Sequence, residues 1–236
     1  MHRRYDEATA ILTTAHLSTM STQLIARAYR TLIPYGIGDA DNMIALTEEL
    51  SACMGFKGAS GGQMLDLARV RIPPHAGGDE EGEEIVDVDG THDRTAACQG
   101  GSEQASKQGA LTRMMRMKTS SFFRIALLSA VYVCSPARLN DDVAAHLRSV
   151  SDNLGLAFQT FDDFDDAQDD FDDARERANN CVNVIGAQAS YERFTEYAHH
   201  SVRLLQELDL YNGVIQEFLD MMHNHILRRM EAMRTH

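Results

Sequence analysis

The sequence predicts an all-α protein, and two observations support this fold class. Apolar residues recur at intervals of three and four along most of the chain, which is the helical period. Alternating apolar and polar residues, which would indicate strands, are nearly absent. A hydrophobic fraction of 44% with 24% charged residues is typical of a folded, soluble chain. With 236 residues, a single domain over residues 1–236 is the simplest organisation.

Helices are predicted before and after an irregular stretch at about residues 70–109. The first spans residues 6–29, and after a break rich in Gly and Pro at residues 33–38, Asp39 or Asp41 can cap a second helix. Further amphipathic helices are predicted over residues 111–133, 143–164, 191–210 and 214–233. Pro136 and Asn140 mark the turn between the first two of these.

The stretch from about residue 70 to 109 has a different character. It contains two adjacent prolines, several glycines and the acidic run from Asp79 to Glu84, with almost no periodic apolar residues. We expect it to be a disordered insertion. The segment Asp87-Val-Asp89-Gly90 is similar to part of a calcium loop, but the EF-hand pattern needs an oxygen ligand where Ile85 stands.

Composition excludes several classes of function. The formal net charge of −13 argues against nucleic-acid binding, because phosphate backbones are held by clusters of Lys and Arg. The N-terminus lacks the apolar core of a signal peptide, and the run from Ile125 to Cys134 is too short to span a bilayer. Four separated cysteines without a CxxC pair predict neither a zinc site nor a disulfide framework, so a cytoplasmic location is expected.

The segment FQTFDDFDDAQDDFDDA, residues 158–174, concentrates carboxylates in an apolar frame. On a helix, Asp162 and Asp166 lie one turn apart on the same face, with Asp163 beside them. Like charges at this spacing destabilise a bare helix, and a divalent cation would remove the repulsion. Magnesium suits such a pair because it takes one or two carboxylates and leaves its other positions to water and phosphate. A solvated acidic face explains the segment equally well when it is taken alone.

The residues around these aspartates extend the pattern. Phe158-Gln159 before Asp162-Asp163-x-x-Asp166 resembles the second aspartate-rich motif of the trans-isoprenyl diphosphate synthase (polyprenyl synthetase) family, farnesyl or geranylgeranyl type. Four more segments resemble family patterns in the same order: His2 to Leu12 (H-x-x-F/Y-G-E-A-x-A-I-L), Gly61 to Leu67 (G-Q-x-x-D-L), Met117 to Phe123 (K-T-x-x-L/F) and Val182 to Gly186 (L-V-N-L-L-G). Each of these is weak by itself, and their shared order carries the resemblance over nearly the whole chain.

The resemblance implies an isoprenoid-synthase-type helical bundle around a central cavity, with aspartate motifs on two facing helices. The family's first D-D-x-x-D motif lies upstream of the segment matched by His2 to Leu12, so an N-terminally truncated bundle is expected. Ala15 stands where the family has a further aspartate.

Family members join an allylic diphosphate to isopentenyl diphosphate, with magnesium stabilising the departing diphosphate. The resemblance therefore implies a magnesium-dependent prenyltransferase of isoprenoid biosynthesis. It assigns Mg²⁺ to Asp162, Asp163 and Asp166, and catalytic contacts to Lys118, Thr119 and Gln159. Substrate binding falls to Gln63, Asp66, Lys118, Gln159, Arg175 and Arg177, the two arginines standing where the family has a G-K-x-T-type segment. Gln63, Asp66 and Lys118 are alternatively ordinary polar residues on a helix surface.

Two other functions remain open. Without the first motif, the chain is alternatively a catalytically impaired or regulatory subunit that partners a full-length synthase. Loss of upstream helices would expose an apolar face that needs a partner, so a homodimer or a heteromer with a full-length synthase is expected. The second of these other functions is that of an acidic helical protein that buffers magnesium or calcium.

Overall fold

The structure is a computed structural model, and it describes residues 19–20, 22–31, 34, 40–68, 103–134, 140–169, 171 and 174–234. Within these ranges the chain is helical except for short connections, and no strand occurs. The predicted all-α class is confirmed. Among the described residues, no helix is long and apolar enough to cross a membrane.

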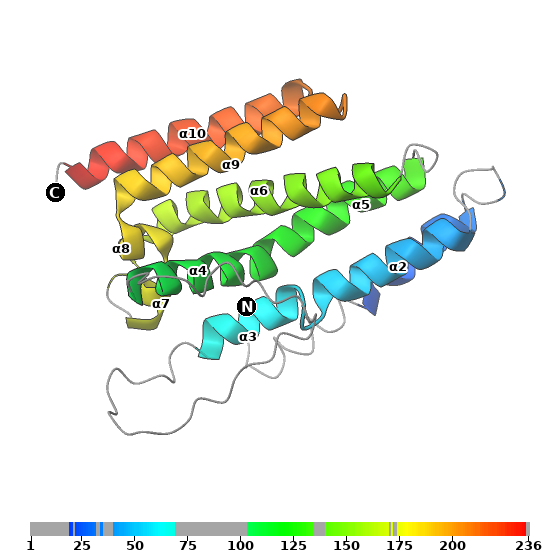
Figure 1. Cartoon of the computed structure of the whole chain (residues 1–236), viewed down its shortest axis with the longest axis horizontal. Coiled ribbons are helices and arrows are strands. Elements are labelled where there is room, and N and C mark those ends of the chain that lie inside the picture. Colours follow the sequence, from blue (N-terminus) through cyan, green and yellow to red (C-terminus); the bar gives the residue numbers. More distant parts are fainter. Residues whose placement is uncertain are drawn as a thin grey trace.

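The helices follow the chain in the order shown in Figure 1. After a helical stretch at residues 22–31 come α2 (Ala40–Met54), α3 (Ala59–Ala68), α4 (Glu103–Met115), the π-helical turn η4 (Arg116–Ser120), α5 (Ser121–Cys134), α6 (Asp141–Asp166), α7 (Ala174–Asn179), α8 (Cys181–Ile185), α9 (Ala187–Glu207) and α10 (Gly213–Arg234). Residues 69–102 of the predicted insertion lie outside the described residues, and its last part, residues 103–109, forms the start of α4.

The long helix α6 lies at the centre of the bundle. It packs against α9 and α10 on one side and against α5 and η4 on the other, while α2 and α3 lie beyond α5 and η4 (Figure 1). Asn140 caps its N-terminus by accepting a hydrogen bond from Val143 N at 2.9 Å, and Asp141 and Asp142 complement the positive end of the helix dipole. The helix therefore starts two residues earlier than its apolar period predicts.

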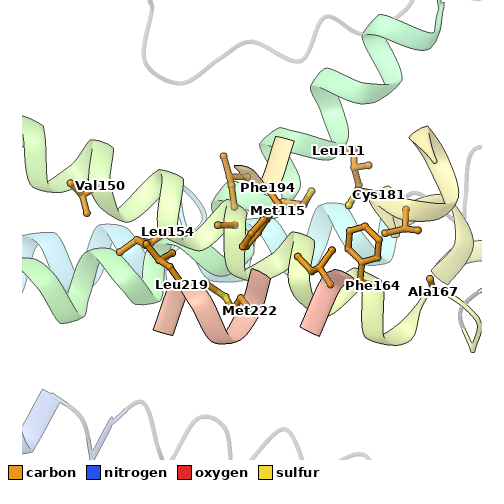
Figure 2. Packing of buried hydrophobic residues seen from close by; sticks show 14 of the residues in the cluster. Leu111, Met115, Val150, Leu154, Phe164, Ala167, Cys181, Phe194, Leu219 and Met222 are labelled. Atoms are coloured by element: carbon orange, nitrogen blue, oxygen red, sulfur yellow. The ribbon is translucent and has the colours of Figure 1, made fainter. Parts of the chain in front are cut away.

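Two apolar clusters hold α6 in place. The larger one contains Leu154 and Phe164 of α6, Phe194 of α9 and Met222 of α10, all buried (Figure 2). The smaller one joins the helical stretch 22–31, α2, α5 and α6, and its buried members are Tyr29, Leu46, Leu128, Tyr132 and Leu147. Burial of such side chains stabilises the fold by roughly 1.5–3 kcal/mol each, so α6 is anchored along its length.

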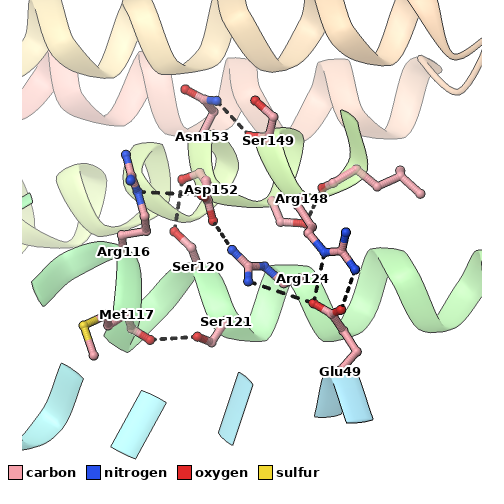
Figure 3. A network of polar contacts seen from close by, with 12 residues as sticks. Glu49, Arg116, Met117, Ser120, Ser121, Arg124, Arg148, Ser149, Asp152 and Asn153 are labelled. Atoms are coloured by element: carbon pink, nitrogen blue, oxygen red, sulfur yellow. Dashed lines mark hydrogen bonds and ion pairs between the residues drawn. The ribbon is translucent and has the colours of Figure 1, made fainter. Parts of the chain in front are cut away.

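Ionic contacts fix the order of α2, α5 and α6 across the bundle (Figure 3). The carboxylate of Glu49 in α2 accepts a hydrogen bond from Arg148 Nη2 at 2.8 Å. Arg124 in α5 lies between two acids, 2.9 Å from Asp152 Oδ1 and 3.9 Å from Glu49 Oε1. These charges are paired and half-buried, so they restrict how α5 can slide along α6.

The π-helical turn η4 is held between two glycines. A β-carbon on Gly155 of α6 would lie 2.4 Å from Ser120 Cα, and one on Gly62 of α3 would lie 2.4 Å from Lys118 N. Such distances are too short for any side chain, so only glycine permits α3 and α6 to approach the turn this closely. A π-turn is rare and often marks a functional site, and this one carries Lys118 and Thr119.

Candidate active site

A polar pocket of about 110 Å³ lies where α3, η4, α6 and the junction of α7 and α8 meet. Its walls are formed by Asp66, Met114, Lys118, Gln159, Asp162, Asp163, Asp166, Asn179 and Asn180. Six of these nine residues were predicted from the sequence. Residues from four separate parts of the chain are thus brought to one place by the packing around η4.

Lys118 is paired with an acid from α3. Its Nζ lies 2.7 Å from Asp66 Oδ2, although the two residues are 52 positions apart. Gln63 supports the same oxygen, since its Nε2 donates to Asp66 Oδ2 at 3.4 Å. The side chain of Lys118 is 37% exposed, so its ammonium group is held in the pocket and remains accessible to an anion. The alternative in which Lys118 is simply a solvated surface residue does not describe this geometry.

Thr119 and Gln159 belong to a second chain of contacts. Thr119 Oγ1 donates to Gln159 Oε1 at 2.6 Å, and Gln159 Nε2 donates to Asp163 Oδ1 at 2.9 Å. The other oxygen of Asp163 accepts a hydrogen bond from Cys181 N at 2.7 Å. The orientation of the Gln159 amide is therefore set by a donor on one side and an acceptor on the other.

Asp163 differs from its neighbours in the aspartate motif. It is 5% exposed, and burial raises its pKa to about 6, although the hydrogen bonds from Cys181 N and the Gln159 amide act in the opposite direction. Both of its carboxylate oxygens accept hydrogen bonds from the protein. Asp162 and Asp166 are more exposed and line the same pocket, so the three predicted metal ligands fall into two environments.

The oxygen donors of the pocket suit a hard cation. Among the residues that the structure describes, no three His, Cys, Asp or Glu side chains are placed to hold a metal ion by themselves. Magnesium does not require such a set, because it binds through one or two carboxylates and keeps water or phosphate oxygens as its other ligands. Asp162 and Asp166, one helical turn apart on the pocket wall, fit that requirement.

Of the two predicted arginines, Arg177 is not among the residues that line the pocket. The guanidinium of Arg177 lies 5.3 Å from the centre of the Phe171 ring, and its Nη1 donates to Phe171 O at 3.4 Å. This contact holds Arg177 on the surface. The backbone of Arg175 lies in α7, and its side chain falls outside the description.

Sequence reasoning missed Asn179 and Asn180. Both are buried, with 8% and 2% exposure, and both line the pocket. Asn180 is the N-cap of α8, because its side chain accepts a hydrogen bond from Asn183 N at 3.2 Å. Two asparagines directly before the apolar start of a helix are a cap signal, and this signal could have identified Asn180.

The C-terminal end of α6, which also carries the pocket aspartates, is fastened to α10. Arg229 Nε donates to Phe164 O at 3.2 Å, and Arg229 Nη2 donates to Asp165 O. His225 Nε2 lies 2.9 Å from Asp165 Oδ1. Carbonyls in the last turn of a helix lack partners within the helix, and Arg229 supplies one. Asp165 therefore belongs to a structural contact and not to the pocket.

A sequence model of the family described as polyprenyl synthetase matches residues 1–180. No curated protein sequence matches the chain. Among solved structures, the chain is similar to a geranyltransferase from Helicobacter pylori 26695, with a TM-score of 0.60 and 20% identity over 96% of this chain and 62% of that chain.

Two other solved structures are similar. A geranyltransferase from Legionella pneumophila has a TM-score of 0.60 and 17% identity over 98% of this chain and 64% of that chain. An FPP/GFPP synthase from Zymomonas mobilis, in an apo structure, has a TM-score of 0.57 and 18% identity over 95% of this chain and 60% of that chain. The chain thus spans between 60% and 64% of the length of these three structures, which share its fold. Since the family model covers more than half of its residues, the chain belongs to the polyprenyl synthetase family and has the all-α isoprenoid synthase fold.

Proposed function

We propose that the chain is an isoprenyl diphosphate synthase-like prenyltransferase that condenses an allylic diphosphate with isopentenyl diphosphate. The observation that carries this proposal is the shared pocket of Lys118, Asp162 and Asp166. A lysine ammonium and two carboxylates around one small space suit a diphosphate with magnesium between it and the carboxylates. Membership of the polyprenyl synthetase family supports the same reaction class.

Asp162 and Asp166 would hold the magnesium. When bound, the ion supplies positive charge that stabilises the departing diphosphate. Asp163 has a different part, because its two oxygens accept hydrogen bonds from Gln159 and Cys181 N. In this proposal Asp163 orients Gln159 in the pocket wall, while Asp162 and Asp166 bind the ion.

The proposed reaction is electrostatic. The bond between the allylic carbon and the diphosphate oxygen breaks, the electron pair leaves with the diphosphate, and the double bond of isopentenyl diphosphate attacks the allylic carbon before a proton is lost. Lys118 would bind the diphosphate oxygens, since its ammonium is held by Asp66 and still accessible. Gln159 would lie against the reacting allylic end of the substrate. Its side-chain amide is already oriented by Thr119 and Asp163, so it would not have to rotate when the substrate binds.

A second candidate function is a catalytically impaired or regulatory subunit that partners a full-length synthase. It is favoured by large apolar side chains on α2, α3, α5 and the connection between α2 and α3 that the described structure leaves exposed. The most exposed are Ile44 at 54%, Phe56 at 76%, Met64 at 55% and Phe122 at 53%. Several exposed apolar residues on neighbouring helices are typical of an interface, so a homodimer or heteromer is proposed with either function.

The decisive assay combines the purified chain with magnesium, radiolabelled isopentenyl diphosphate and dimethylallyl, geranyl or farnesyl diphosphate. Asp162→Asn and Asp166→Asn are each expected to lower product formation by about 10–100-fold, since they remove a ligand without changing shape. The matched control is Asp169→Asn, because Asp169 is exposed beyond the end of α6 and does not line the pocket. Product formation that survives the double substitution of Asp162 and Asp166 would contradict the proposed site.

The same reagents separate the alternatives. No turnover alone, with changed product formation when a full-length family member is added, identifies the regulatory subunit. Binding of magnesium without any binding of diphosphate identifies a cation buffer and rejects both prenyltransferase-related functions.

A further inference from the structure

Three consecutive residues at the junction of α7 and α8 contact both buried acids of the pocket. Asn179 Nδ2 donates to Asp66 Oδ1 at 2.5 Å and to Asp66 O at 3.1 Å. Asn180 Nδ2 donates to Asp163 O at 2.8 Å, and Cys181 N donates to Asp163 Oδ2 at 2.7 Å. Asp66 belongs to α3 and Asp163 to α6, so this short segment joins two helices that carry the pocket walls.

Each of these two acids is linked by hydrogen bonds to a different residue of η4. Asp66 pairs with Lys118 at 2.7 Å, whereas Asp163 accepts from Gln159, which in turn accepts from Thr119. Lys118 and Thr119 are neighbours in the chain. Two separate chains of hydrogen bonds therefore start at Asn179 and at Asn180-Cys181 and end on adjacent residues of the π-helical turn.

The geometry of Asn179 gives its amide a specific effect on Asp66. One Nδ2 group donates to both the backbone oxygen and Oδ1 of Asp66, and this fixes the carboxylate relative to its own backbone. Oδ2 is the oxygen that meets Lys118 and Gln63. Because an amide is neutral, it orients the carboxylate without competing for its charge, and the whole charge remains opposed to Lys118.

We propose that Asn179 is a positioning residue that aligns Lys118 through the carboxylate of Asp66. In the same proposal, Asn180 holds the backbone of Asp163 so that Cys181 N can orient the Asp163 carboxylate toward Gln159. The proposal rests on the diphosphate-binding role of Lys118 given above and extends it. A purely structural role would consist of satisfying buried polar groups of α3 and α6, and it would not change the environment of Lys118 once the fold is intact.

The first test measures Lys118 itself and needs no substrate. The chain has three lysines, Lys57, Lys107 and Lys118, so mass spectrometry can follow reductive methylation of each amine with two internal references. In Asn179→Leu, which keeps the bulk and removes the donor, Asp66 is released and Lys118 is expected to be methylated several-fold faster. Asn179→Ala serves as a second variant if the leucine side chain disturbs folding, and circular dichroism confirms the fold of each.

Two further substitutions show whether the effect is specific. Asn180→Ala removes a contact to Asp163 and is expected to leave the methylation rate of Lys118 unchanged while it alters the NMR signals of the Gln159 side-chain amide. Asn183→Ala is the matched control, because Asn183 lies in α8 shortly after this segment and its Nδ2 donates to Ala167 O at 2.9 Å. It is expected to change neither readout.

The second test uses calorimetric binding of inorganic diphosphate in the presence of magnesium. Asn179→Leu is expected to weaken binding by about tenfold, in the range seen for residues that orient a binding group, while Asn183→Ala binds as the unsubstituted chain does. Unchanged methylation of Lys118 in the folded Asn179 variants would overturn the positioning role. Faster methylation in a chain that binds no diphosphate would support the positioning role and reject the proposed function, so the two failures are distinguishable.

Discussion

Thr119 Oγ1 donates a hydrogen bond to Gln159 Oε1 over 2.6 Å, across 40 residues of sequence. The contact links the π-helical turn to the central helix α6 and sets which end of the Gln159 amide faces Asp163. A side chain held by two partners loses little entropy when a substrate arrives, so the wall of the pocket is organised before binding.

The first prediction concerns this contact. Thr119→Val keeps the shape and removes the hydroxyl, so the Gln159 amide loses its donor and can rotate. Product formation in the prenyltransferase assay is expected to fall by about tenfold, with a loss of only about 1 kcal/mol in the free energy of unfolding. Thr112→Val is the control, since Thr112 Oγ1 donates within its own helix to Gln108 O at 3.0 Å. Equal turnover in the two variants would show that the Gln159 orientation is irrelevant to the reaction.

The second prediction concerns the close packing of α6 against η4. In Gly155→Ala, the new methyl group would meet Ser120 Cα at 2.4 Å, and the two segments must separate. We expect a loss of about 1–3 kcal/mol in the free energy of unfolding, measured by urea denaturation. Gly109→Ala is the matched substitution, because nothing lies within 4 Å of its β-carbon in α4. It should stabilise the chain by about 0.5–1 kcal/mol through helix propensity, and equal effects of both substitutions would argue against close packing at Gly155.

The third prediction follows from the pKa of Asp163, which burial raises to about 6 from an ordinary value of 3.8. At a pH between these two pKa values, Asp163 is protonated in the folded chain and ionised in the unfolded chain. The contribution of Asp163 to the free energy of unfolding therefore falls as the pH rises from about 4 to above 6. A pKa shift of this size corresponds to roughly 2–3 kcal/mol in the free energy of unfolding.

Asp163→Asn removes this titration. The difference in the free energy of unfolding between Asp163→Asn and the unsubstituted chain should therefore move in favour of the variant as pH rises from 4 to 7, measured by urea denaturation with EDTA. Asp169→Asn, at an exposed position, is measured beside it as the matched aspartate-to-asparagine substitution. A flat difference for Asp163→Asn would place the pKa of Asp163 near its ordinary value.

The fourth prediction concerns two buried thiols. Burial raises the pKa of Cys53 to about 11 and that of Cys181 well above its ordinary value, so both are protonated at pH 8. Cys98 and the side chain of Cys134 lie outside what the structure describes, and both are replaced by serine for the measurement. The two remaining thiols should react slowly with Ellman's reagent in the folded chain and rapidly in urea. Rapid reaction of both without urea would contradict their burial.

The fifth prediction concerns the attachment of α6 to α10. Arg229→Met keeps most of the bulk but removes the guanidinium that donates to the carbonyls of Phe164 and Asp165. We expect a loss of about 1–2 kcal/mol in the free energy of unfolding. The adjacent Arg228 is exposed, so Arg228→Met should have almost no effect. Similar losses for the two arginines would mean that general charge, and not the contact with α6, supports this end of the bundle.

The sequence predicted most of the pocket because its motifs are local. The spacing of Asp162 and Asp166 places them on one helix face, and both line the pocket. Gln63 and Asp66 were matched as a short pattern, and they lie together beside Lys118. The prediction for Arg177 has a different outcome, since Phe171 holds this side chain on the surface by a contact that no spacing rule contains.

Helical periodicity and the order of the motifs were sufficient to determine the all-α class, the family and the segment that carries the carboxylates, because each is encoded over a few neighbouring residues. Tertiary structure alone decided that the Asp163 carboxylate accepts a hydrogen bond from Cys181 N, while Asp162 and Asp166 line the pocket. It also decided that Asn179 donates a hydrogen bond to Asp66, 113 residues away in the sequence. The physical reason is distance in the sequence. These contacts exist only when Gly62 and Gly155 allow α3 and α6 to close on η4, and that packing depends on all three segments at once.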